Sequence, residues 1–150
     1  MLPKNITENY IQTQKIGEDL AKEIIKNKLQ KKAVVLFLKG NLGSGKTTFL
    51  QGFSKGLEIK EKILSPTFVI MKRFKINKSQ FENFYHFDCY RLKNNEDLDL
   101  LDWKEIIKNP KNIIAVEWPE YFEKVLQKNT ITIEFKFIEE NKREINLKIW

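Results

Sequence analysis

The sequence predicts an α/β fold with a mixed, partly antiparallel sheet, and three observations point to it. Segments 33–38 and 112–116 are unbroken apolar runs of strand length, typical of parallel strands buried on both faces. Segment 11–29 places apolar residues at helical spacing among lysines and glutamates. The C-terminal segment alternates apolar and polar residues, with the apolar ones at Ile131, Ile133, Phe135, Phe137, Ile145, Leu147 and Ile149. Such alternation is typical of antiparallel strands, and residues 139–143 would join the two as a hairpin.

The other elements can be placed in order along the chain. Thr7 or Thr13 would cap the first helix, and strand 33–39 follows it. A second helix begins at residue 47, reaches about Lys55 and ends near Gly56. The remaining elements are a turn at Ser65-Pro66-Thr67, a hairpin of strands 68–71 and 81–87 around residues 77–79, a helix over 94–108 stopped by Pro110, and strand 112–116. We expect strands 33–39 and 112–116 to lie parallel in the core, with the hairpins at the edges.

A glycine-rich loop joins strand 33–39 to the second helix. It consists of Gly40-Asn41-Leu42-Gly43-Ser44-Gly45-Lys46-Thr47 and matches the pattern G-x-x-x-x-G-K-[ST]. Its glycines let successive backbone N–H groups turn towards a phosphate chain, and the helix adds the positive end of its dipole. We therefore expect the loop and Thr48 to bind nucleotide phosphates, Lys46 to reach the β- and γ-phosphates, and Thr47 to ligate Mg²⁺. Strand, loop and helix in this order predict a three-layer fold like that of P-loop NTPases.

Acidic residues end two of the apolar segments. Glu117 follows strand 112–116, and Asp88 follows Phe84-Tyr85-His86-Phe87. Either carboxylate could hold Mg²⁺ or act in hydrolysis, for example by orienting the attacking water, and the sequence leaves open which is nearer the metal. Thr67 lies where a switch threonine would sense the metal and the γ-phosphate, although a plain turn residue would also fit there.

Neighbouring residues have more than one interpretation. His86, the only histidine, could orient Asp88 or a phosphate, but a single histidine on an aromatic strand is more often packed inside the fold. Arg91 could pair with Asp88, contact phosphate, bind a partner or form a structural ion pair. Trp118 and Pro119 would fix the backbone beyond the strand that ends at residue 117.

Composition narrows the classes of protein. The chain of 150 residues fits one domain, residues 1–150, and its formal net charge is +7, from 27 basic and 20 acidic residues. The basic residues are mostly scattered lysines, which a compositional bias explains at least as well as nucleic-acid binding, so no DNA partner is expected. No apolar run is long enough to span a membrane, and no membrane partner is expected. The single cysteine, Cys89, excludes an intrachain disulfide, and with no signal-peptide pattern the expected location is cytoplasmic.

Four sequence blocks together resemble the TsaE family, formerly called YjeE, of small bacterial P-loop ATPases. They are the loop 40–49, Ser65-Pro66-Thr67-Phe68, His86-Phe87-Asp88-Cys89-Tyr90-Arg91-Leu92 and Glu117-Trp118-Pro119-Glu120. The second and fourth blocks discriminate best, because many ATPases share the loop. The chain departs from the family pattern at Asn41, where Asp is usual, and at Ser44, Cys89 and Asp102, where Ala, Leu and Gly are common.

The resemblance implies a role in forming N6-threonylcarbamoyladenosine at position 37 of tRNA. In that family the ATPase does not transfer the threonylcarbamoyl group; it acts with a TsaD–TsaB complex and meets tRNA through that complex. ATP and Mg²⁺ would be the cofactors. Carried over to this chain, Lys46 and Thr47 hold phosphate and metal, Asp88 and Glu117 are the acidic metal and hydrolysis residues, and Thr67 is the switch. Trp118 would lie beside the nucleotide pocket.

Two other functions fit parts of the pattern. The first is a small P-loop kinase acting on a metabolite or nucleoside, although segment 72–81 is short and lysine-rich for a lid. The second is a nucleotide-gated binding module without catalysis. The three arginines are dispersed, so we expect an ATPase that is weak alone and needs a partner to complete its site. The Asn-Lys-x-Asp motif that reads guanine is missing from the sequence, which favours ATP.

Overall fold

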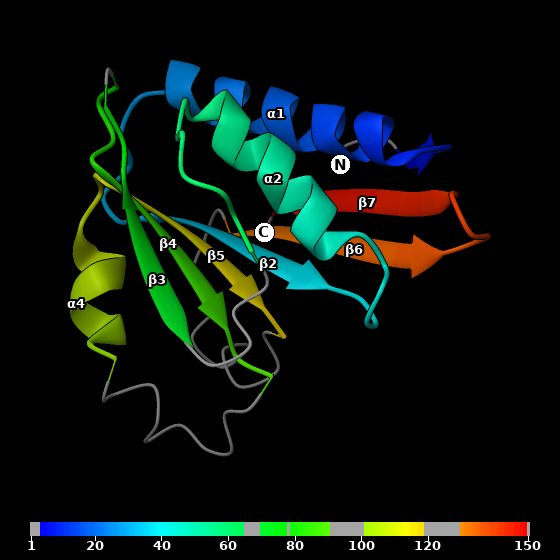
Figure 1. Ribbon diagram of the computed structural model, residues 1–150. Coiled ribbons are helices and arrows are strands. Elements are labelled where there is room, and N and C mark those ends of the chain that lie inside the picture. The colour runs from blue at the N-terminus through cyan, green and yellow to red at the C-terminus, as the bar shows by residue number, and fades with distance from the viewer. Residues whose placement is uncertain (1–3, 65–69, 78, 91–100, 119–129, 150) are drawn as a thin grey trace.

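The computed structural model describes residues 4–64, 70–77, 79–90, 101–118 and 130–149, which form one seven-stranded sheet with three helices (Figure 1). The strands lie in the order β1-β7-β6-β2-β5-β4-β3. The element bounds are β1 Asn5–Thr7, α1 Tyr10–Lys26, β2 Val34–Lys39, α2 Lys46–Gly56, β3 Met71–Lys75, β4 Asn83–Asp88, α4 Trp103–Lys108, β5 Asn112–Glu117, β6 Ile131–Phe137 and β7 Arg143–Ile149.

The sheet is mixed, as the sequence predicts. Strand β2 pairs in parallel with β5 on one side and with β6 on the other, and β4 pairs in parallel with β5. The outer strands β3, β7 and β1 pair antiparallel with their neighbours. The carboxyl ends of β2, β4, β5 and β6 therefore meet at one edge of the sheet, where an α/β fold usually builds its site.

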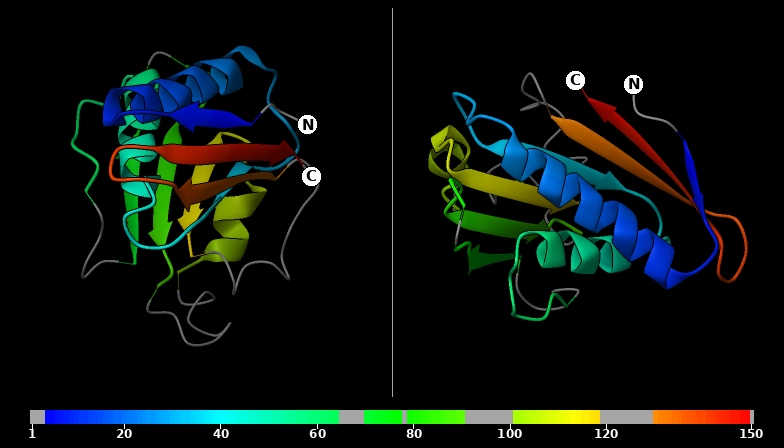
Figure 2. Two further views of the ribbon diagram at one scale, coloured as in Figure 1. Left: turned by 90° about the vertical axis from the view of Figure 1, so that its right-hand side faces the viewer. Right: turned by 90° about the horizontal axis from the view of Figure 1, so that it is seen from above.

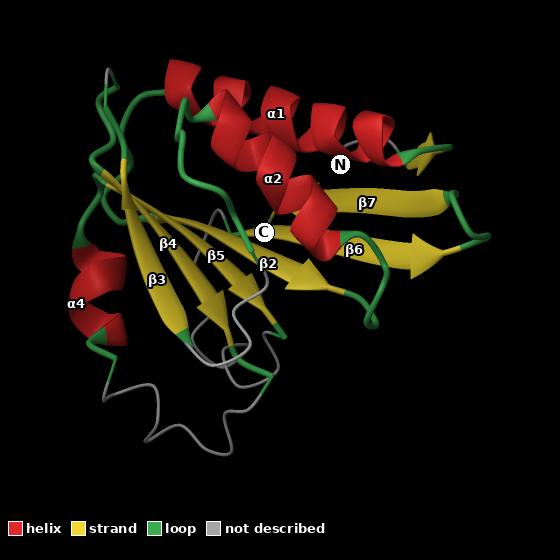
Figure 3. Ribbon diagram, viewed as in Figure 1, coloured by secondary structure: helices red, strands yellow, loops and turns green. Residues whose placement is uncertain are grey.

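Helices cover both faces of the sheet and complete three layers, as Figure 2 and Figure 3 show. The face under α1 and α2 contributes one buried cluster, which includes Leu36, Leu38, Phe84 and Ala115. On the opposite face Phe37, Phe87 and Val116 of the sheet pack with Trp103 of α4. The alternation of these residues along β2, β4 and β5 fixes which side chains point towards α2.

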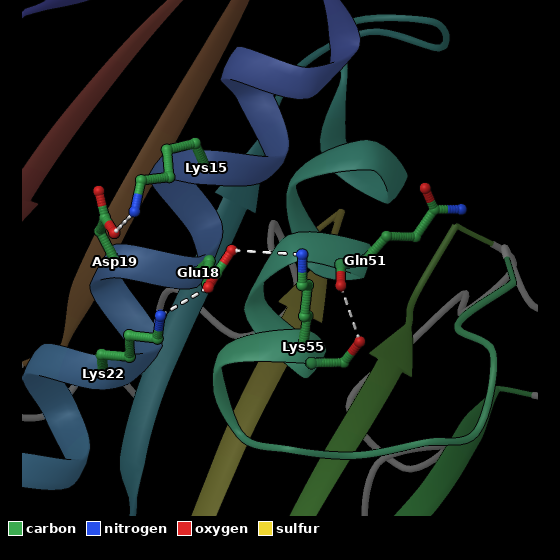
Figure 4. Close-up of polar contacts among 7 residues, drawn as sticks. Lys15, Glu18, Asp19, Lys22, Gln51 and Lys55 are labelled. Carbon is green, nitrogen blue, oxygen red and sulfur yellow. Dashed lines mark hydrogen bonds and ion pairs between the residues drawn. The ribbon is translucent and has the colours of Figure 1, made fainter.

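Helices α1 and α2 cross with almost no space between their backbones. A Cβ atom added to Gly52 would lie 1.9 Å from the carbonyl oxygen of Gln14, and one added to Gly17 would lie 2.2 Å from that of Phe49. Glu18 of α1 also pairs with Lys22 at 2.6 Å and reaches towards Lys55 of α2 at 3.9 Å (Figure 4). Because surface ion pairs contribute little, the glycine contacts set the position of α2.

The start of the chain differs from the sequence-based expectation. The cap of α1 is Asn9, whose side chain accepts a hydrogen bond from the backbone N–H of Gln12, so the prediction of Thr7 or Thr13 was wrong. The hydroxyls of Thr7 and Thr13 bond to each other at 2.8 Å in the interior instead. Thr7 belongs to β1, a three-residue strand that the sequence analysis missed because so short a segment shows no periodicity.

Two other boundaries also differ. Strand β3 is Met71–Lys75, whereas the predicted strand was 68–71, part of which lies outside the described residues. Helix α4 begins at Trp103, and residues 94–100 of the predicted helix lie outside the described residues as well. Strand β3 forms one edge of the described sheet and exposes Lys72, Arg73 and Lys75. No helix in the described part of the chain is long and apolar enough to cross a membrane.

Candidate functional site

The loop between β2 and α2 has the backbone of a phosphate-binding loop. Gly43 and Gly45 have φ angles of +76° and +107°, a region that glycine enters without strain. Gly45 is also the N-cap of α2 and offers no side chain to its first N–H groups, which leaves them for a ligand. A Cβ atom on Gly40 would lie 2.5 Å from Ser44 Oγ and 2.9 Å from the carbonyl oxygen of Phe135, so only glycine fits there.

Lys46 folds back over this loop. Its side chain is 5% exposed, its Nζ donates a hydrogen bond to the carbonyl oxygen of Gly40 at 2.5 Å, and the same nitrogen lies 3.9 Å from the centre of the Trp118 ring. The hydroxyl of Ser44 is buried with no hydrogen-bond partner among the described residues. A buried cation and an unsatisfied hydroxyl beside open N–H groups suit a phosphate chain.

The two carboxylates predicted from strand ends lie next to each other. Asp88 on β4 and Glu117 on β5 are register partners, and Leu38 of β2 is the partner of Glu117 on the other side. Their strands place both side chains on the face towards α2, and the backbone N–H of Cys89 donates to the carbonyl oxygen of Glu117 at 3.0 Å. Together with the hydroxyl of Thr47, on the first turn of α2, they are the hard oxygen ligands that Mg²⁺ prefers.

The two carboxylates have different environments. Glu117 is 3% exposed and bonds to Nε2 of His86 at 2.6 Å, whereas Asp88 is half-buried. Burial raises the pKa of Asp88 above its usual range, and the negative charge of Glu117 acts in the same direction. The hydrogen bond from the backbone N–H of Tyr90 and the charges of His86 and Lys46 oppose the rise.

Replacing Asp88 by asparagine is therefore expected to stabilise the ligand-free protein at neutral pH by about 1–3 °C in Tm, because it removes a partly buried charge. Since the folded-state pKa of Asp88 is raised, the destabilising contribution of Asp88 to the wild type fades as the pH falls through that pKa and the carboxyl becomes neutral. The advantage of Asp88→Asn should shrink accordingly. Thermal unfolding from neutral to acidic pH measures it, and an advantage that does not change with pH would contradict the explanation.

Trp118 lies directly above the loop lysine. Its φ of +57° is rare for a residue with a bulky side chain, and its ring packs 5.0 Å from that of Tyr90, centre to centre. This backbone conformation, immediately after Glu117, turns the indole over Lys46. For Lys46 to contact a nucleotide phosphate, its Nζ must leave the Gly40 carbonyl and change its contact with the indole.

Nucleotide binding should consequently change the fluorescence of Trp118. We expect titration with ADP to alter the tryptophan emission of the wild type, and Trp118→Phe to remove most of that change. Trp103, the first residue of α4, is buried on the opposite face of the sheet and provides the matched control. Trp103→Phe should keep the response, and a response that follows Trp103 instead would disprove the assignment.

The structure brings together four of the residues singled out from the sequence, namely Lys46, Asp88, Glu117 and Trp118. Asn41, Leu42, Gly43, Ser44, Gly45, Thr47 and Thr48 lie in the loop and the first turn of α2, with Leu42 exposed at its tip. Thr67, Arg91 and Pro119 lie outside the described residues. His86 is packed in the interior and contacts Glu117, a pairing that the sequence analysis did not consider.

The fold and this loop define the class of the protein as P-loop NTPase-like. The sequence profile described as "Threonylcarbamoyl adenosine biosynthesis protein TsaE" matches residues 7–145. The chain therefore belongs to the TsaE family, whose curated members are named for tRNA threonylcarbamoyladenosine biosynthesis.

Individual relatives agree with this assignment. The chain is 31% identical over 149 residues to the Aquifex aeolicus protein of that name, an alignment that covers 98% of this chain and 96% of the relative. It is 43% identical over 89 residues to the Nostoc sp. protein, covering 57% of this chain and 52% of the relative. The crystal structure of Bacillus subtilis YdiB superposes with a TM-score of 0.68 at 29% identity, over 95% of this chain and 82% of that one.

Proposed function

We propose that the chain is a Mg²⁺-dependent ATPase that supports formation of N6-threonylcarbamoyladenosine at position 37 of tRNA, together with TsaD and TsaB. The observation that carries the proposal is a buried loop lysine whose charge acts on Asp88, which lies beside Glu117 at the edge where β2, β4 and β5 end. The carboxylates and the loop lie on the same side of the sheet, which is what binding and hydrolysis of a nucleotide require.

Each residue has a part in this proposal. The N–H groups of Asn41, Leu42, Gly43, Ser44, Gly45 and Thr48 bind phosphate oxygens, and Lys46 contacts the outer phosphates. Thr47, Asp88 and Glu117 provide the oxygen atoms for Mg²⁺, which when bound neutralises phosphate charge. Glu117 and Asp88 also orient the attacking water, with Thr67 as the switch residue, and Trp118 closes the pocket over Lys46.

The environments of the carboxylates suggest how they divide this work. Glu117 is held in one orientation by a buried hydrogen bond, which suits a group that must aim at one point. Asp88 accepts a hydrogen bond from the Tyr90 N–H at 3.1 Å and is more accessible, which suits a ligand that adjusts as the nucleotide enters.

We further propose that hydrolysis is slow until a partner binds. Of the two arginines in the described part of the chain, Arg73 lies on the edge strand β3, and Nη1 of Arg143 donates to three carbonyl groups of the β6–β7 turn. The guanidinium of Arg143 is thus held by that turn, although its side chain passes Gly45 of the loop, and a partner could supply the positive charge that accelerates phosphoryl transfer. TsaD–TsaB would be that partner, with tRNA reached through it and the protein located in the cytoplasm.

The test is ATP hydrolysis by the purified chain, alone and with TsaD–TsaB from the same organism, with Mg²⁺ or with excess chelator. We expect slow hydrolysis alone and strong, Mg²⁺-dependent stimulation by the partners that Lys46→Ala removes. Fast hydrolysis by the isolated chain would contradict partner activation. Binding of ATP with no hydrolysis under any condition would contradict the ATPase proposal and favour a kinase or a binding module.

A further inference from the structure

His86 contacts a carboxylate of the site and yet lies too deep to meet a substrate. It is 1% exposed, and its Nε2 lies 2.6 Å from Oε2 of Glu117. With Glu117 ionised, Nε2–H donates this bond to the carboxylate. Hydrogen bonds to a charged acceptor are short and strong, and this one joins two groups that water hardly reaches.

The sheet register shows how the bond acts. His86 on β4 pairs in register with Ala115 on β5, and Asp88 pairs with Glu117, the last residue of β5. The bond between His86 and Glu117 therefore crosses diagonally from β4 to the carboxyl end of β5. Oε2 of Glu117 is therefore drawn along the sheet towards the interior. Oε1 makes no hydrogen bond within the described part of the chain. The histidine thus determines which oxygen of the carboxylate is turned inward and which remains for the nucleotide side.

We propose that His86 is a positioning residue that fixes the orientation of the Glu117 carboxylate towards the nucleotide. The proposal rests on the proposed ATPase function, because it assigns His86 a role through Glu117. Without a donor at this place, the buried carboxylate would lose a hydrogen bond that it cannot replace with water. It would then rotate towards another donor, which misplaces Oε1.

The first test compares two substitutions of His86. His86→Phe keeps a ring but removes the donor, whereas His86→Gln places an amide nitrogen close to the position of Nε2. In the presence of TsaD–TsaB we expect His86→Phe to lower kcat about 10- to 100-fold, the usual effect of losing such a supporting residue, and His86→Gln to restore most of it. The dissociation constant for ATP in the presence of a chelator should stay within about twofold of wild type, since His86 does not touch the loop.

A matched control comes from the other end of the same strand pair. Asn83 on β4 donates from Nδ2 to Oδ1 of Asn112 on β5 at 3.1 Å, so it also links the two strands with a polar bond. Asn83→Ala removes that link away from the nucleotide site. We expect kcat to remain within about twofold of wild type, and a loss equal to that of His86→Phe would show that both act only through the packing of the strands and would overturn the proposal.

A double-mutant cycle with Glu117 gives the decisive comparison. If His86 acts through Glu117, then His86→Phe should reduce kcat little further in a Glu117→Gln background. Additive losses would overturn the proposal, and so would wild-type kcat in a folded His86→Phe protein. Thermal unfolding checks the fold, and His86→Asn, which is polar but too short to reach Glu117, serves if the phenylalanine variant unfolds.

Binding provides a readout that does not depend on hydrolysis. Calorimetric titration with ADP, with Mg²⁺ and with chelator, gives the change in affinity due to the metal. His86→Phe should change that quantity by the same factor as Glu117→Gln, and unequal factors would count against the proposal. If the wild type binds nucleotide but does not hydrolyse ATP even with its partners, the proposed function fails, while this comparison still tests the role of His86.

Discussion

Replacing Lys46 by alanine is expected to weaken ATP binding by about 1.5–3 kcal/mol, or roughly 10- to 150-fold in Kd, and to abolish hydrolysis. The substitution removes a cation whose Nζ lies directly over the phosphate loop, bonded to the carbonyl oxygen of Gly40. Thermal unfolding of the variant checks that the fold survives the loss of the Nζ contacts with the Gly40 carbonyl and the Trp118 ring. Calorimetric titration with ATP measures the effect directly.

Lys55 provides the control for Lys46→Ala. It belongs to the same helix, carries the same charge and lies exposed at the far end of α2, 3.9 Å from Glu18. Lys55→Ala should leave the affinity for ATP unchanged. Equal losses in the two variants would mean that the helix is sensitive to charge in general and that Lys46 does not contact the nucleotide.

Gly52→Ala should have the largest effect on stability. The added Cβ would come within 1.9 Å of the Gln14 carbonyl oxygen and 2.6 Å of its Cα, and backbone atoms of a packed helix cannot step aside individually. Helix α1 would have to move away from α2, at a cost of about 3 kcal/mol or more, which lowers Tm by roughly 6–12 °C in a chain of this size. Thermal unfolding followed by circular dichroism measures the loss.

The same substitution at Gly43 shows whether the effect comes from the helix crossing. A Cβ atom there meets nothing within 4 Å, but the φ of +76° is strained for alanine. Gly43→Ala should thus cost only about 1–2 kcal/mol of stability. If the two variants lost the same stability, close approach of α1 and α2 would not explain the requirement for glycine at position 52.

The sequence was most informative where the signal is contiguous. The phosphate loop and its flanking strand and helix could be predicted because one run of residues, 33–55, contains the whole motif. The sequence also placed Asp88 and Glu117 at the ends of apolar segments, but the parallel pairing of β4 with β5 that makes them neighbours was not predicted. The role of Thr67 as a switch residue stays a prediction, because Thr67 lies outside the described residues.

Contacts that depend on register or on backbone conformation could not be predicted. The bond from His86 to Glu117 requires knowing that residue 86 stands opposite residue 115, and no local pattern gives that number. The indole of Trp118 reaches Lys46 only through a positive φ, which is unusual for tryptophan. At the N-terminus, the residue type of Thr7 suits a helix cap. In the structure, however, Thr7 belongs to strand β1 and its hydroxyl bonds to the hydroxyl of Thr13.

The edge strand β3 offers an explanation for part of the protein's positive charge that does not involve a nucleic acid. An open edge of a sheet offers unpaired N–H and C=O groups to any other exposed strand, and proteins often prevent such pairing with lysine and arginine. Three of the five residues of β3, Lys72, Arg73 and Lys75, are exposed and positively charged. Two copies of the chain that approached each other along this edge would bring six positive charges together. Repulsion between these charges disfavours strand-to-strand aggregation, and this role explains the three residues without an acidic ligand.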